Sequence, residues 1–117
     1  MAVKEGGLRC YSVDIPATAG VLTIPMVDAY VVTEVIMNIE TALGGTDTVT
    51  VGKTGANAAF LADADVGLGA AGYYRSSEGV AVNGNGFKLG TEDLIIERIG
   101  ATSGGGEVYF LLTPVVA

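Results

Sequence analysis

The side chains that carry most enzyme chemistry are scarce in this sequence. It contains no histidine, the commonest general base and metal ligand, and its single cysteine, Cys10, therefore has no histidine to activate it. Cys10 falls in a predicted strand, where a cysteine usually packs as a small core residue. Two carboxylates can hydrolyse glycosides, but there is no tryptophan to line a sugar cleft and the chain is short. The sequence predicts no catalytic residue and no enzyme activity.

Two glycine-containing stretches match nucleotide-binding motifs only in part. Residues 67–72 have the spacing of a dinucleotide fingerprint, and Glu92 and Asp93 follow about twenty residues later. That site needs a helix after its glycines, which residues 73–77 do not predict. Residues 52–54 end like a phosphate loop, but Asp47 occupies the position of its first glycine. Both stretches are predicted to be turns or loops, and no cofactor is expected.

Asp63 and Asp65 form the one carboxylate pair with spacing suited to a hard cation. Calcium takes six to eight oxygen ligands, often from closely spaced carboxylates. The next acidic or amide side chain after this pair is Glu78, so the ligand set is short. Solvated loop carboxylates are the favoured interpretation, no metal is predicted, and cation binding by this pair stays an open alternative.

Charge and composition narrow the classes of partner. The formal net charge is −7 with only six basic residues, which are scattered along the chain, so nucleic acids and anionic membranes are disfavoured. Half of the residues are hydrophobic and 16% are charged. This balance indicates that part of the exposed surface is covered by a partner protein.

The length of 117 residues predicts one domain, residues 1–117, with a short flexible N-terminal arm. Residues 1–7 lack the apolar core of a signal peptide, and no apolar run is long enough to span a membrane. One cysteine cannot form a disulfide within the chain. We therefore expect a soluble protein that is made in a cytoplasm.

Short runs with a period of two predict strands throughout the chain. Strands are expected at residues 9–15, 21–26, 30–41, 47–52, 94–99 and 107–113, with a further extended piece from Tyr73. Residues 53–57 are predicted to be a loop, and residues 58–64 are either a helical turn or a strand. Asn-Gly pairs at 83–86 predict a hairpin between residues 80–82 and 87–89, and the last two strands are expected to form a terminal hairpin.

The longest run, residues 30–41, predicts a strand with one core-facing side. The alternation places Val31, Thr33, Val35, Met37 and Ile39 on that side, and its density of β-branched residues argues against a helix. About eight short strands without an amphipathic helix between them predict an all-β fold, a jelly-roll or β-sandwich of antiparallel strands.

Three stretches resemble small structural proteins of tailed bacteriophages. These are residues 94–112, which look like a closing hairpin, residues 47–52, and residues 58–61. The resemblance implies a jelly-roll or β-sandwich of this size that decorates or cements the outside of a capsid, often as a trimer, with no catalytic residues. It makes the major capsid protein the expected partner and the virion exterior the expected location, after synthesis in the host cytoplasm.

Alternative roles stay open beside capsid decoration. One is a tail or fibre domain that binds a host receptor, with Tyr30, Tyr73 and Tyr74 exposed to contact sugar. Another is a cellular binding module. A homo-oligomer is expected, with a trimer favoured, and the candidate buried positions are Val115, Val116 and the side of residues 30–41 that carries Val31, Val35 and Met37.

Overall fold

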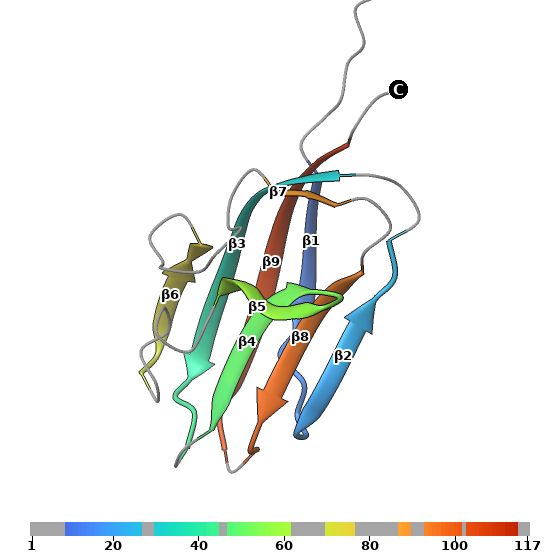
Figure 1. Cartoon of the computed structure of the whole chain (residues 1–117). Coiled ribbons are helices and arrows are strands. Elements are labelled where there is room, and N and C mark those ends of the chain that lie inside the picture. The colour runs from blue at the N-terminus through green and yellow to red at the C-terminus, as the bar shows by residue number, and fades with distance from the viewer. Residues whose placement is uncertain are drawn as a thin grey trace, which may run out of the picture.

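The computed structural model describes residues 9–26, 30–44, 47–61, 70–76, 87–89, 93–101 and 103–114. These residues form nine strands and no α-helix (Figure 1). The strands are β1 (Arg9–Asp14), β2 (Gly20–Ile24), β3 (Tyr30–Thr41), β4 (Thr48–Lys53), β5 (Ala56–Leu61), β6 (Gly72–Arg75), β7 (Phe87–Leu89), β8 (Leu94–Ile99) and β9 (Gly105–Pro114). No helix among the described residues could cross a membrane.

The strands form two antiparallel sheets that pack face to face (Figure 1). Sheet A has the order β1-β9-β3-β6, and β7 pairs with the start of β3, so β6 and β7 share one position in the sheet. Sheet B has the order β2-β8-β4-β5. Successive strands lie in different sheets at β1–β2, β2–β3, β3–β4, β5–β6, β7–β8 and β8–β9. This connectivity is that of a jelly roll, so the predicted fold class is confirmed.

Apolar side chains at alternating positions fill the space between the sheets. Val108, Phe110 and Leu112 project inward from β9 of sheet A, and Val49 and Val51 project inward from β4 of sheet B as predicted; all are at most 1% exposed. The same cluster contains twelve further buried apolar side chains: Ile15, Tyr30, Val32, Val35, Met37, Ile39, Leu43, Ala59, Phe60, Leu61, Leu94 and Ile96. The period-two pattern therefore places one apolar face of each sheet in a shared core.

The predicted inward side of β3 is correct only in the second half of the strand. Val35 and Met37 are buried, but Thr33 is exposed and the buried residue before it is Val32. The pairing of β3 with β9 shifts register between Val32 and Glu34. This bulge adds one residue to β3, which moves the inward side from even to odd positions.

The prediction of a terminal hairpin is wrong, because β8 and β9 lie in different sheets. β8 pairs with β2 and β4, whereas β9 pairs with β1 and β3. The connection between them crosses the end of the sandwich, with Gly100 and Gly104 at positive φ. The alternation of apolar and polar residues indicates which face of a strand is buried, but not which strands lie beside it. For this reason the sequence predicted a hairpin between two strands that do not pair.

The hairpin that does form joins β4 to β5. Residues 53–57 were predicted to be a loop, but Lys53 ends β4, Ala56 begins β5, and only Thr54 and Gly55 form the turn. Gly55 has a φ of 84°, which suits glycine in so tight a turn. Of the two readings for residues 58–64, the strand is observed through Leu61. The strand predicted at residues 80–82 and its Asn-Gly turns lie outside the described residues.

Candidate functional site

The candidate chemical motifs do not assemble into a catalytic site among the described residues. Asp63, Asp65 and Glu92 lie outside those residues. Gly72, the last glycine of the dinucleotide-like stretch, begins strand β6 instead of a helix. Asp93 has structural contacts, because its Oδ1 accepts a hydrogen bond from the Met26 amide at 3.0 Å and its amide donates to Thr54 Oγ1 at 3.1 Å. Within the described part of the chain, no three histidine, cysteine, aspartate or glutamate side chains could hold a metal ion.

Several side-chain positions differ from the sequence predictions. Cys10, predicted to be a core residue, is exposed on β1, the edge strand of sheet A. Tyr30 was expected at the surface but is only 7% exposed, because the bulge of β3 turns it toward the core. Val35 and Met37 are fully buried within the domain, so they cannot contribute to an oligomer interface. Val31, a further interface candidate, is half-buried, and residues 115–116 lie outside the described structure.

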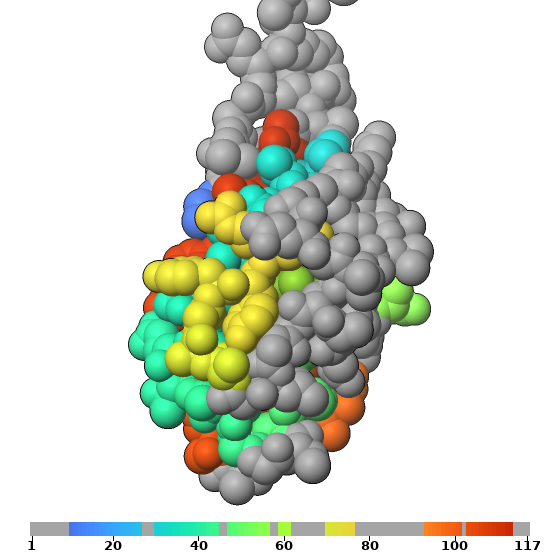
Figure 2. Space-filling view, turned by 90° about the vertical axis from the view of Figure 1, so that its left-hand side faces the viewer, coloured from blue at the N-terminus to red at the C-terminus, as the bar shows by residue number. Residues whose placement is uncertain are grey.

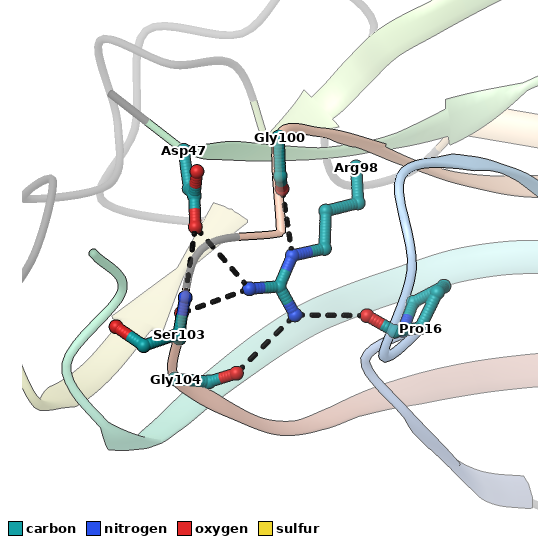
Figure 3. A network of polar contacts seen from close by, with 6 residues as sticks. All are labelled: Pro16, Asp47, Arg98, Gly100, Ser103 and Gly104. Carbon is teal, nitrogen blue, oxygen red and sulfur yellow. Dashed lines mark hydrogen bonds and ion pairs between the residues drawn. The ribbon is translucent and has the colours of Figure 1, made fainter. Parts of the chain in front are cut away.

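A buried ion pair closes one end of the sandwich (Figure 3). Arg98, at the end of β8, places Nη2 3.5 Å from Oδ2 of Asp47, and both side chains are at most 3% exposed. The guanidinium also donates to four carbonyl oxygens at 2.9–3.2 Å, those of Pro16, Gly100, Ser103 and Gly104. Asp47 Oδ2 accepts a further hydrogen bond from the Ser103 amide at 3.4 Å.

This network ties together three connections of the jelly roll: β1–β2 through Pro16, β3–β4 through Asp47, and β8–β9 through the Arg98 partners. A buried charge is tolerated only when it is paired and hydrogen-bonded, and here the guanidinium meets both conditions. The role is structural, because the pair is shielded from any partner. The pair was not predicted from the sequence, although an arginine on the inward side of β8, with Leu94 and Ile96, is a signal that a buried partner must exist.

The outer face of sheet A is acidic and aromatic. Register places Asp14 beside Glu107 and Glu107 beside Asn38, which pairs with Tyr73 of β6. Tyr73 is 70% exposed, and β6 lies at the molecular surface at the edge of sheet A, next to β3 (Figure 2). Glu34 and Arg75 form an ion pair of 3.6 Å on the same face.

Glu40 and Glu107 crowd the end of this acidic face. A side-chain hydrogen bond to Glu107, together with the negative charges of Glu107 and Asp14, raises the pKa of the Glu40 carboxyl. Partial desolvation and the charge of Glu107 raise the pKa of the Tyr109 hydroxyl. The Glu40 shift reflects the close approach of carboxylates on this face, whereas the Tyr109 shift comes mainly from desolvation.

The outer face and free edge of sheet B have the opposite character. Val21 and Ile99 are 54% and 57% exposed, Thr23 is exposed, and the only charged side chain among their neighbours on β2 and β8 is Glu97. β2 is an edge strand without any charged residue. Unprotected edge strands of this kind readily accept another strand.

Two hollows flank β2. One is an apolar cavity of about 130 Å³ between the sheets at the end of β2, lined by Tyr11, Ile24, Pro25, Met26, Tyr30, Leu94 and Phe110. The other, of about 300 Å³, is shallower and lies at the start of β2, lined by Pro16, Thr18, Ala19, Gly20, Val21 and Leu22. The free edge of β2 therefore runs between two depressions, which makes it the best-formed candidate binding surface of the described residues.

Comparison with known proteins yields a likeness of fold. No protein-family model matches the sequence, and no curated protein matches it. Among solved structures, a chain of the cyanophage Pam1 capsid asymmetric unit superposes with a TM-score of 0.57 at 18% sequence identity. The match covers 97% of this chain and 90% of that chain. The two proteins therefore share one fold over nearly their whole lengths.

Proposed function

We propose that this protein is a structural component of a bacteriophage virion, a decoration or cement protein that binds the outer surface of the major capsid protein and stabilises the shell. The observation that carries the proposal is the match to a chain of a phage capsid asymmetric unit over 97% of this chain. Because 90% of the other chain is also covered, the likeness extends over a whole chain of similar size and not over one domain of a much larger subunit.

The surface chemistry supports a passive binding role. The neutral edge and outer face of sheet B provide main-chain groups and apolar side chains for docking, and the net charge of −7 keeps the protein away from packaged nucleic acid. Glu97 is the only charged side chain beside the exposed residues of β2 and β8, so docking here depends little on ionic strength, since salt screens mainly exposed charge pairs. The proposal assigns no catalytic step to any residue.

The experiment compares phage particles with and without this protein. A cement binds the assembled shell and not dissociated subunits, so it stabilises the shell by mass action. Removal is expected to lower the melting temperature of the capsid and to reduce DNA retention, and adding the purified protein back is expected to restore both. Identical melting and full DNA retention without the protein would contradict a cementing role.

A receptor-binding domain of a tail or fibre is the second candidate. The 70% exposure of Tyr73, on a face with Tyr109 beside it, favours this role because exposed aromatic side chains suit recognition surfaces. Copy number separates the two candidates. A cement is expected in hundreds of copies per virion, whereas a fibre-tip domain is expected in few. We further propose that the protein is a homo-oligomer on the capsid, with a trimer favoured, which symmetry in a particle reconstruction would test.

A further inference from the structure

We propose that an extended segment of the capsid partner adds to the free edge of β2 as a fifth strand of sheet B, with one apolar side chain inserted into the cavity beside Ile24 and Met26. This inference rests on the proposed function and specifies where the contact is made. In this arrangement the capsid partner contributes a β-strand to the contact and not a flat surface.

The edges of the two sheets differ in how they are protected. Edge strands usually carry charges that discourage pairing with other chains. β1 contains Arg9 and Asp14, β6 contains Arg75, and β7 contains Lys88. β5 has no charge, but three of its side chains, Ala59, Phe60 and Leu61, are buried. Among the described strands, only β2 combines an unpaired edge, exposed side chains and the absence of charge.

The main chain of β2 provides the directional part of the contact. Among the described strands β2 pairs with β8 alone, in a register that runs without a break from Gly20 opposite Arg98 to Ile24 opposite Leu94. In an antiparallel pair, about half of the amide and carbonyl groups of an edge strand point away from its neighbour. Those groups can bond a new strand whatever its side chains are, as in other cases of strand addition.

The cavity provides the selective part of the contact. Its volume of about 130 Å³ is close to that of cavities which hold one benzene-sized group. Its lining comes from both sheets, with Tyr11 on β1 and Ile24 on β2, and Tyr11 is 41% exposed. A strand that runs along β2 would reach this cavity at the end marked by Pro25. A large apolar side chain at that point of the segment fits the space.

A second copy of this chain does not fit the site through its own β2. The β2 side chains that would point toward the cavity, Leu22 and Ile24, already pack against the core of their own domain. The occupant is therefore an extended segment whose apolar side chain is free before binding.

The test measures amide hydrogen exchange of the full-length protein, alone and bound to capsid shells assembled without it. We expect amides of β2 (Gly20–Ile24) to become protected on binding while those of β1 (Arg9–Asp14) stay unchanged. If the protein fails to bind shells at all, the proposed function fails. If it binds and the β2 amides are unchanged, only this inference is overturned. Protection of β2 that rises with protein concentration in the absence of shells would identify a second copy as the occupant, and would also overturn it.

Two matched double variants add an independent measurement. Val21→Lys with Thr23→Lys places two charges on the exposed positions of β2, and Cys10→Lys with Ser12→Lys places the same charges on exposed positions of β1. We expect the β2 variant to lose at least about tenfold in affinity for shells and the β1 variant to change by less than about twofold. Unfolding curves of both variants establish that they are folded. Equal affinities of two folded variants would overturn the proposal.

Discussion

The two ends of the sandwich are closed in different ways. At the end where β8 passes into β9, the Arg98 guanidinium binds Asp47 and four carbonyl oxygens of the connecting segments. At the opposite end, where β2 finishes and β3 begins, apolar side chains line a cavity of about 130 Å³. Directional polar contacts around the buried pair of Arg98 and Asp47 hold one end. Apolar contacts that leave space unfilled hold the other.

This difference assigns stability to one end of the domain and binding to the other. A buried, hydrogen-bonded ion pair has few alternative arrangements, so it fixes the connections around it, whereas an unfilled apolar cavity lacks part of its packing contacts and can accept a group from outside. The proposed docking edge, β2, runs from the polar end toward the apolar end. The comparison predicts that substitutions at the polar end affect folding, and that substitutions at β2 and its cavity affect binding.

The largest expected effect is loss of the Arg98 network. Arg98→Met removes the guanidinium that neutralises the buried Asp47 carboxylate, which should lower the free energy of unfolding by about 3–5 kcal/mol. Urea denaturation measures the change. Adding Asp47→Leu to this variant removes the buried carboxylate as well and should recover part of the loss. If Arg98→Met costs less than about 1 kcal/mol, the network does not hold this end.

Truncating side chains that line the cavity should destabilise the protein more in its buried wall than at its exposed rim. Phe110 is fully buried and Tyr11 is 41% exposed, although both line the same cavity. Phe110→Ala is expected to cost about 3–4 kcal/mol and Tyr11→Ala about 1 kcal/mol, as the rim side chain buries less apolar surface. Thermal unfolding of the two variants tests the order. Equal losses would show that the cavity has no exposed rim.

Two glycines with similar backbone angles offer a matched comparison of the two ends. Gly104 at the polar end has a φ of 86°, and Gly55 in the β4–β5 turn at the other end has a φ of 84°. A Cβ atom at position 104 would clash with the Ala42 carbonyl, whereas one at position 55 would meet nothing. Gly55→Ala should cost about 1–2 kcal/mol from backbone strain alone, and Gly104→Ala distinctly more. Similar unfolding midpoints for the two variants would indicate that the backbone around Gly104 can shift to accept a Cβ atom.

The smallest expected effect concerns the acidic face beside the polar end. The pKa of Glu40 is raised in the folded state, so the folded protein binds a proton at this carboxyl more tightly than the unfolded chain does. The protonated carboxyl therefore contributes to stability at low pH, and this contribution is lost as the pH rises through the raised pKa. Glu40→Gln should therefore raise the melting temperature slightly at pH 7 and leave it unchanged near pH 3, where the carboxyl is protonated. Glu34→Gln is the control, since it removes an ion pair with Arg75 and should not stabilise. A lower melting temperature for Glu40→Gln at pH 7 would contradict repulsion between Glu40 and the neighbouring carboxylates.

Much of the strand content was predictable from the sequence, for a local reason. The period-two pattern found β3 and β8 with their observed bounds, because alternation follows from the pleat of a strand that is buried on one face. The inward positions Val49 and Val51 were found in the same way. The same pattern failed across Thr33, since a bulge is an insertion in the pairing with β9 and leaves no mark in the composition of β3.

The sequence by itself determined an all-β sandwich with an apolar interior, an acidic charge and few side chains suited to catalysis. Tertiary structure decided which strands are neighbours, and so placed β8 and β9 in opposite sheets. It also brought Asp47 to Arg98 across 51 residues of chain and left β2 as an uncharged edge beside a cavity. The physical reason is that alternation and composition are properties of each strand alone, whereas pairing, buried ion pairs and free edges depend on the order in which the strands pack.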